Sequence, residues 1–323
     1  MRSIILAALL SVTACGSDDG GPIAIDDLSN AVFSSVCNQY VACGVIDDTA
    51  TCLKLFGDDT VDQDLVAAVH AGKVIYHSDK AGECLAGFGS SCDRTRFFGT
   101  ESAACDQTFT GTVGEGGQCA IKEECISQDC DVPSCPDACC QGTCIGGTPP
   151  VKSQVGGPCD SSSDCSQSYC DFTSSTCMPY KQLGAACQGS SECAQGACVS
   201  QMCTLLPDTG QPCGQATTAA CRNIGDVCST TSMTCVHVGL SGDACTSDRD
   251  CSELYYCDTT MHCKVGPLLG DPCTGDCAGA SYCDGTTCVA RKATNAACQS
   301  DEECTSRTCD PTSMVCVAVP VCI

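Results

Sequence analysis

Long apolar runs are scarce in this chain of 323 residues. The most apolar stretch, residues 3–14, is too short to cross a bilayer, which takes about 20 residues in a helix. No later stretch is long enough either. The sequence therefore predicts no membrane-spanning helix.

Positive charge is also scarce, with 15 Lys and Arg residues against 39 Asp and Glu residues and a formal net charge of -24. This balance argues against nucleic-acid phosphates or anionic lipid headgroups as partners. Two acidic clusters offer oxygen atoms of the kind that bind calcium. They are Asp248, Asp250 and Glu253, and Asp58, Asp59, Asp62 and Asp64. No EF-hand loop is present, so we interpret both clusters as solvated surface and predict no metal site and no cofactor.

Groups with catalytic potential are few. The chain has four histidines and lacks a Gly-x-Ser-x-Gly elbow, a His-Glu-x-x-His motif and a phosphate-binding glycine loop. His70 and His77 could share one helix face if a helix continued past Gly72. His237 and His262 lie in or beside short loops, where a pocket is hard to build. The sequence therefore favours a protein that is not an enzyme.

Cysteine, by contrast, is abundant, with 39 residues. A content above about 8–10% is typical of disulfide scaffolds, and such scaffolds occur in oxidising compartments. Zinc is the alternative, but the cysteine spacings are mostly longer than the Cys-x-x-Cys knuckles of zinc sites. We therefore predict disulfides, and two separate bridges for the vicinal pair Cys139 and Cys140.

The N-terminus has the order of parts of a secretion signal: Arg2, then an apolar stretch, then small residues. The segment Val12-Thr13-Ala14-Cys15 resembles the lipobox of bacterial lipoproteins. This resemblance implies cleavage after residue 14, a lipid on Cys15, a flexible tether over residues 15–22 and a place in the bacterial cell envelope, at the outer membrane or cell surface. The alternatives are an ordinary signal peptide cut after Ala14 and a signal peptide that is not cleaved. Without Cys15 the cysteine count is even, as complete pairing requires.

Residues 23–112, here called the helical segment, show helical periodicity. Leu28, Val32 and Val36 recur at helical spacing after two aspartates, and a second run leads to His70. A short extended stretch is expected at residues 74–76. The segment holds six cysteines, an even number that suits a self-contained disulfide-bonded domain: Cys37, Cys43, Cys52, Cys84, Cys92 and Cys105.

Residues 113–316 form a tandem array of seven cysteine-rich repeats. The repeats, numbered 1 to 7, span residues 119–144, 159–177, 187–203, 213–235, 245–263, 273–288 and 298–316. In most of them an acidic residue precedes the second cysteine. Such short units cannot bury enough apolar surface, so disulfides have to replace a core. Repeats 2 to 7 carry four cysteines each, and the structural disulfides predicted in repeats 2, 5 and 7 use Cys159, Cys165, Cys170, Cys177, Cys245, Cys251, Cys257, Cys263, Cys298, Cys304, Cys309 and Cys316.

Four cysteines allow three pairings, and the sequence cannot choose among them. We favour first-to-third and second-to-fourth. Repeat 1 carries an insert with three further cysteines, Cys135, Cys139 and Cys140, and the tail 317–323 holds Cys322. Cys322 could pair with an insert cysteine or with another chain.

The stretches from Gly156 to Cys177 and from Gly242 to Cys263 resemble the Dickkopf N-terminal cysteine-rich repeat. The whole layout is similar to cysteine-rich lipoproteins of myxobacteria. The resemblance covers about residues 114–316, rests mainly on cysteine spacing, and implies small disulfide-rich hairpin modules. We expect an array that is extended rather than globular. In secreted animal members such repeats bind receptors.

Three functions remain open at this point. The leading hypothesis is a non-enzymatic surface lipoprotein that uses its repeats for multivalent binding or adhesion to an extracellular protein or polysaccharide. The second is a protease inhibitor, with Lys122, Lys181, Arg222 or Arg249 in its reactive loop. The third is an enzyme of the cell envelope centred on His70 and His77.

Non-reducing peptide mass spectrometry on protein isolated from membranes tests the lipobox prediction. We expect the N-terminal peptide of the mature protein to begin at Cys15 and to carry lipid. A mature protein whose Cys15 bears no lipid would contradict the predicted anchor.

Overall fold

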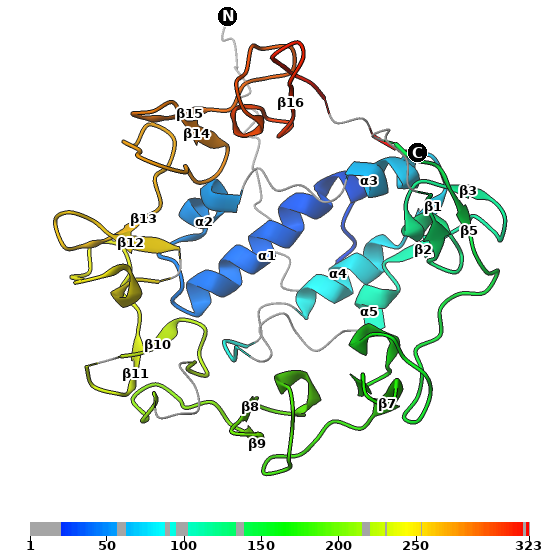
Figure 1. Ribbon diagram of the computed structural model, residues 1–323, viewed down its shortest axis with the longest axis horizontal. Helices are drawn as coiled ribbons and strands as arrows, with labels where there is room; N and C mark the ends of the chain where they lie inside the picture. The colour runs from blue at the N-terminus through cyan, green and yellow to red at the C-terminus, as the bar shows by residue number, and fades with distance from the viewer. Residues whose placement is uncertain are drawn as a thin grey trace, which may run out of the picture.

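The computed structural model describes residues 21–56, 63–87, 91–94, 103–133, 139–214, 220–229, 231–252, 254–318 and 321–322. The predicted signal peptide and Cys15 lie outside these residues. Among the described helices, none is both long and apolar enough to cross a membrane. The chain builds helices first and a series of small hairpins afterwards (Figure 1).

The helical segment contains five α-helices and one pair of strands in its described part. A 3-10 turn, η1 (Ile25–Asp27), leads into α1. The α-helices are α1 (Leu28–Ala42), α2 (Thr49–Phe56), α3 (Gln63–His70), α4 (Ser78–Ala86) and α5 (Ala103–Asp106). Strands β1 (Val74–Tyr76) and β2 (Phe109–Gly111) pair antiparallel. The predicted helix after Asp27, the predicted helix up to His70 and the extended stretch at residues 74–76 are confirmed.

Disulfides join the helices of this segment to one another. Cys37–Cys52 links α1 to α2, Cys84–Cys105 links α4 to α5, and Cys43–Cys92 closes the loop beyond α1. The six cysteines of the helical segment therefore pair among themselves. Because α2 and α5 have only 8 and 4 residues, they are too short to be stable alone and depend on these links.

Each repeat is a small antiparallel hairpin, in most cases preceded by a 3-10 turn. Repeat 1 has three strands in the order β3-β5-β4. Its elements are β3 (Gln118–Cys119), η2 (Lys122–Glu124), β4 (Cys130–Asp131) and β5 (Gly142–Cys144). The others are η3 (Ser162–Asp164), β6 (Tyr169–Asp171), β7 (Thr176–Met178), η4 (Ser190–Glu192), β8 (Ala197–Val199), β9 (Met202–Thr204), β10 (Asp226–Cys228), β11 (Cys235–His237), η5 (Asp248–Asp250), β12 (Tyr255–Cys257), β13 (Cys263–Val265), β14 (Ser281–Cys283), β15 (Cys288–Ala290), η6 (Asp301–Glu303), β16 (Cys309–Asp310) and β17 (Val315–Cys316).

All seven repeats have the same disulfide pairing, first cysteine to third and second to fourth, which is the pairing that we favoured. The pairs are 119–130 and 125–144, 159–170 and 165–177, 187–198 and 193–203, 213–228 and 221–235, 245–257 and 251–263, 273–283 and 277–288, and 298–309 and 304–316. The two bridges pack together and form the buried centre of each repeat, so the repeat fold is a disulfide-rich hairpin fold.

The acidic residue before the second cysteine caps the 3-10 turn. In repeat 2 one carboxylate oxygen of Asp164 accepts the backbone N–H groups of Asp160 at 2.9 Å and Ser161 at 2.7 Å. These two bonds hold the pKa of the Asp164 carboxyl below its usual value. Asp250 makes the same pair of bonds in repeat 5. The acidic residue that precedes the second cysteine in most repeats thus caps backbone N–H groups that have no partner within the 3-10 turn.

Two pairs of neighbouring repeats, 2 with 3 and 6 with 7, are joined by a lysine in the linker between them. Lys181 lies 5.7 Å from the ring centre of Tyr169 in repeat 2 and 2.5 Å from the capping carboxylate of Glu192 in repeat 3. Lys292 joins Tyr282 of repeat 6 to Glu303 of repeat 7 in the same way. The hydrogen bond that Lys181 donates to the Glu192 carboxylate raises the pKa of the Lys181 ammonium. One cation therefore fixes the relative positions of two repeats through a ring face and a carboxylate.

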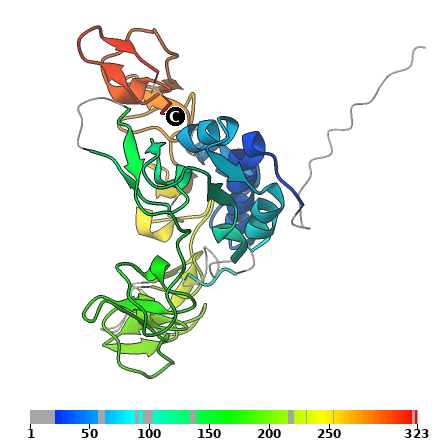
Figure 2. The same ribbon diagram turned by 90° about the vertical axis from the view of Figure 1, so that its right-hand side faces the viewer.

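The repeats curve around the helical segment, with α1 near the middle of Figure 1 and the hairpins along the rim. In the side view the helices lie against one side of the layer that the repeats form (Figure 2). The expected extended array is not confirmed, because apolar contacts hold the repeats against the helices. Ile46 and the Cys37–Cys52 bridge form one buried cluster with repeat 5, including Tyr255.

Tyr255 provides a test of this contact. Its phenol O–H donates to the Asp47 carboxylate at 2.7 Å and accepts the Asp47 N–H at 3.2 Å, and burial raises the pKa of the phenol. We expect Tyr255→Phe to lower the free energy of unfolding by about 1.5–3 kcal/mol, as for hydrogen bonds to charged groups. Denaturant unfolding monitored by circular dichroism measures the change.

Tyr256, the next residue of β12, is the matched control because its side chain points to the other face of the strand. Tyr256→Phe should change the free energy of unfolding by less than about 0.5 kcal/mol. Equal effects of the two substitutions would show that Tyr255 does not hold repeat 5 on the helices.

Candidate functional site

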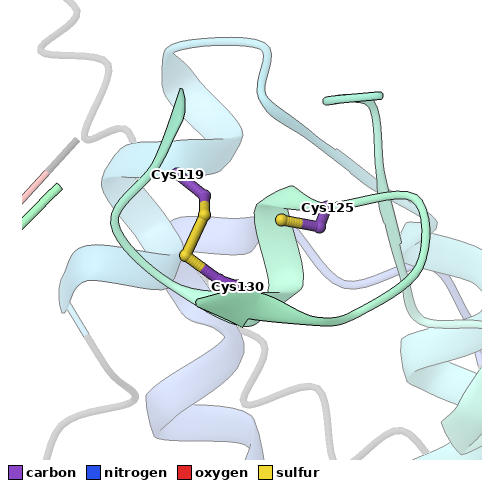
Figure 3. A group of neighbouring side chains, drawn as sticks. All are labelled: Cys119, Cys125 and Cys130. Carbon is purple, nitrogen blue, oxygen red and sulfur yellow. A yellow bond between two sulfur atoms is a disulfide. The ribbon is translucent and has the colours of Figure 1, made fainter. Parts of the chain in front are cut away.

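Metal binding is the first use to consider for so many sulfur atoms. In repeat 1 the sulfurs of Cys119, Cys125 and Cys130 lie within 4.8 Å of one another. Figure 3 shows that Cys119 and Cys130 share a disulfide. Cys125 is bonded to Cys144, which the figure does not draw. The corresponding groups in the other repeats are crossed disulfides as well. Metal binding by cysteine requires thiolates, so these groups are structural bridges.

The described carboxylates of the two acidic clusters accept backbone N–H groups. Asp248 accepts the N–H of Cys257 at 2.8 Å, and Asp250 caps the turn of repeat 5. Asp64 accepts the N–H of Cys322 at 2.8 Å. Glu253, Asp58, Asp59 and Asp62 lie outside the described residues. The described carboxylates of both clusters are thus engaged in holding loops.

The prediction that His70 and His77 could share a helix face is wrong. Helix α3 ends at His70, because Gly72 adopts a φ of 74°, and strand β1 separates it from His77. His70 Nε2 lies 3.0 Å from Asp26 Oδ1, whereas His77 Nε2 lies 3.2 Å from Thr110 Oγ1. The two rings thus have separate partners.

His237 ties repeat 4 to the helical segment. Its Nδ1 lies 3.0 Å from Oδ1 of Asp226, whose side chain is fully buried and also accepts the Thr209 hydroxyl at 2.5 Å. The other side of the imidazole covers Gly44, where a Cβ would lie 2.2 Å from Nε2. Only glycine leaves room for this ring. His262 of repeat 5 contacts the Thr260 hydroxyl instead, at 3.3 Å.

The four basic residues considered for an inhibitor loop fall into two groups. Lys181 holds the joint between repeats 2 and 3, and Arg222 pairs with Asp93 of the helical segment at 2.9 Å. Lys122 and Arg249 are exposed on 3-10 turns. Neither 3-10 turn is an extended stretch of the kind that adds to a protease cleft as a strand.

Methionine is the residue type that the sequence analysis overlooked. The chain has six methionines, and Met1 lies outside the described residues. The other five belong to the hairpins of five repeats, and 38–50% of each is exposed: Met178, Met202, Met233, Met261 and Met314. Large apolar side chains usually lie in the core, so the exposure of all five methionines in the described part of the chain is informative.

Three of these methionines occupy a strained backbone position. Met233, Met261 and Met314 have φ values of 53°, 63° and 53°, in the left-handed region. Each lies two residues before the fourth cysteine, and its carbonyl accepts the N–H of the first cysteine at 2.9 Å. Ser175 and Gln201 fill the same position in repeats 2 and 3. The fold therefore requires the backbone conformation and tolerates a polar side chain there.

In repeat 5 the hairpin turn lies at the opposite end of the hairpin from Tyr255, which is bonded to Asp47 of the helical segment. In repeat 5 the pair Tyr255 and Val265, at the open end of the hairpin, packs against the helical segment. The pair Cys257 and Cys263 lies at the other end, next to the turn that holds Met261. The thioether of Met261 is thus presented to solvent by a backbone that two disulfides fix.

Repeats 2 and 3 add further apolar side chains. Of the seventeen large apolar residues that are exposed in the described chain, eight lie between residues 151 and 205. Phe172, in the turn of repeat 2, is 68% exposed. Met178 lies opposite Tyr169 on the paired strand, and the ring of Tyr180 lies 6.3 Å from that of Tyr169. Concentrated exposed apolar residues of this kind mark interaction surfaces.

Comparison with protein-family models, with curated proteins and with solved structures finds no match to this chain. The resemblance to Dickkopf repeats therefore stays a prediction.

Met261→Gly separates a structural role from a surface role. Glycine adopts a positive φ without strain, so we expect this substitution to leave the free energy of unfolding unchanged or to raise it by up to about 1 kcal/mol. Met202→Gly is the control, because Met202 lies within strand β9. It should lower stability by about 0.5–1 kcal/mol. A large loss on Met261→Gly, measured by denaturant unfolding, would indicate that this side chain supports the fold.

Proposed function

We propose that this protein is a non-enzymatic, lipid-anchored binding protein of the bacterial cell surface. Its repeats hold the methionines defined above as contact groups for a second protein. The observation that supports this proposal is the set of five exposed methionines, one on each of five hairpins. Cys15 would supply the anchor and residues 15–22 the tether, as the lipobox resemblance implies.

Methionine suits a surface that adapts to its partner. Its unbranched side chain has a polarizable thioether and packs against apolar groups of different shapes. The chain as a whole is acidic, with a formal net charge of -24. A partner with apolar side chains beside lysines or arginines would therefore gain both packing and electrostatic attraction. An amphipathic basic segment of an extracellular protein has this chemistry.

A protein is favoured over a polysaccharide because a thioether is only a weak hydrogen-bond acceptor and gives little to sugar hydroxyl groups. Several hairpins on one chain also allow simultaneous contacts. A partner that engages two or more hairpins binds more tightly than one hairpin alone would, through the high effective concentration of the second contact.

A synthetic amphipathic peptide, with leucines on one helix face and lysines on the other, serves as the probe. We expect the mature protein to bind it in calorimetry, and a variant with all five methionines changed to Gln to bind at least about tenfold more weakly. The matched control variant changes Leu269 and Ile75 to Gln, because these side chains are at least as exposed but lie outside the hairpins. It should keep full affinity.

Two peptide controls separate the contribution of apolar packing from that of charge. Replacing leucine by serine should abolish binding, and replacing lysine by glutamate should weaken it. Equal affinity of the five-methionine variant and the unchanged protein would overturn the proposal. Binding of neutral polysaccharides in the same assay, with none to the peptide, would overturn the choice of a protein partner.

A further inference from the structure

One disulfide differs from all the others in the described chain. Cys139, in the insert of repeat 1, is bonded to Cys322, in the tail after repeat 7, across a sequence separation of 183 residues. The other described disulfides have separations of 10 to 49 and stay within one repeat or within the helical segment. Cys322 thus pairs with an insert cysteine, one of the two partners that the sequence left open.

This disulfide closes the array. Figure 1 shows that the C-terminal tail ends beside β3 and β1, at the start of the array, after the repeats have passed around the helices. We call the Cys139–Cys322 bond the clasp. Because each repeat already has its own two bridges, the clasp is not needed to fold any single repeat.

The clasp determines how repeat 7 is held to the helical segment, because Lys292 with Glu303 joins this repeat to repeat 6 and not to the helices. Repeats 1, 4 and 5 are bonded directly to the helical segment, through Lys73 and Glu124, Arg222 and Asp93, and Ser252 and Val45. Within the part of the chain that the structure describes, no hydrogen bond or ion pair joins residues 298–316 to that segment. The tail does so instead, because the N–H of Cys322 donates to Asp64 of α3 at 2.8 Å.

The clasp is also the accessible disulfide. Cys139 is the one exposed cysteine in the described ranges, and Cys322 is half-buried. The bridges inside the repeats have at least one buried sulfur partner each, such as Cys125, Cys165 and Cys304. Exchange requires a thiolate to reach a disulfide sulfur in line, so access decides which bond reacts first.

We propose that the clasp is a thiol–disulfide exchange site for a dithiol reductant of the cell envelope, and that its reduction releases the tail and repeat 7. One thiolate of the dithiol attacks Sγ of the exposed Cys139, and Cys322 leaves as a thiolate. The second thiol of the reductant then attacks the mixed disulfide, which frees Cys139 as a thiolate. The dithiol loses two electrons and becomes a disulfide, and the clasp gains two electrons and becomes two thiols.

Release would change more than the tail. A hollow of about 340 Å³ lies between α2 and the last two repeats, with Phe56 on one side and Glu302 and Arg307 of repeat 7 on another. Since repeat 7 forms part of its wall, movement of this repeat opens the hollow. Whether the clasp is a disulfide or two thiols thus determines how repeat 7 is placed at the C-terminal end of the array.

Limited reduction tests the exchange site. The mature protein is treated with low concentrations of dithiothreitol, alkylated, and mapped by peptide mass spectrometry over time. We expect Cys139 and Cys322 to be alkylated together and at least about tenfold faster than any other cysteine. Earlier labelling of Cys140, of the helical segment or of any repeat would overturn the proposal.

Hydrogen exchange tests the release. After clasp-selective reduction and alkylation, the amide of Cys322 should lose protection, while the amides of Cys298 and Cys316 inside repeat 7 stay protected by their bonds to Met314 and Ala296. The double variant Cys139→Ser/Cys322→Ser should give the same pattern without reductant. Asp64→Asn is the matched control, which weakens the tail contact but keeps the disulfide. Unchanged protection of Cys322 after reduction would overturn the release.

Discussion

The crossed pair of disulfides is the interaction on which the rest of this structure depends. Each repeat has too few residues to bury an apolar core, and its centre consists of cysteine sulfurs. By the chain-entropy account, a bridge closing a loop of about 15 residues restricts the unfolded chain by about 3 kcal/mol. Once the sulfurs fill the centre, large apolar side chains are not needed there. That freedom explains how methionines can lie on the surface in five repeats.

The same constraint shapes the contacts between parts. A rigid repeat can be held in place by a few fixed groups, so single polar side chains suffice as joints. Lys181 is one example, since it binds a ring and a carboxylate, and His237, which is paired with Asp226, is another. The carboxylates that cap the 3-10 turns are also the partners of these lysines. The same carboxylate oxygens therefore cap the 3-10 turns and bind the lysines that join neighbouring repeats. This double role accounts for part of the acidic composition.

Much of the local structure was predictable, because cysteine spacing and helical periodicity act over short distances. The helix after Asp27, the helix that ends at His70 and the hairpin repeats all followed from such patterns. The curved arrangement did not, because it depends on contacts such as Tyr255 with Asp47, 208 residues apart, that leave no local signal. The methionines were visible in the sequence, just before or after the fourth cysteine, but their exposure was not. The usual expectation for methionine is burial, and only the structure shows that the disulfides occupy the place where it would lie.

The disulfide between Cys139 and Cys322 also limits how many repeats the chain can contain. Tandem arrays commonly vary in the number of their units, since each unit contacts only its neighbours and another can be inserted without harm. Here the two ends must meet, so the number of repeats is tied to the circumference of the path around the helices. A gene duplication or loss of one unit would leave Cys322 away from its partner and expose two free thiols. The disulfide between the two ends thus fixes the number of repeats, and with it the size of the protein.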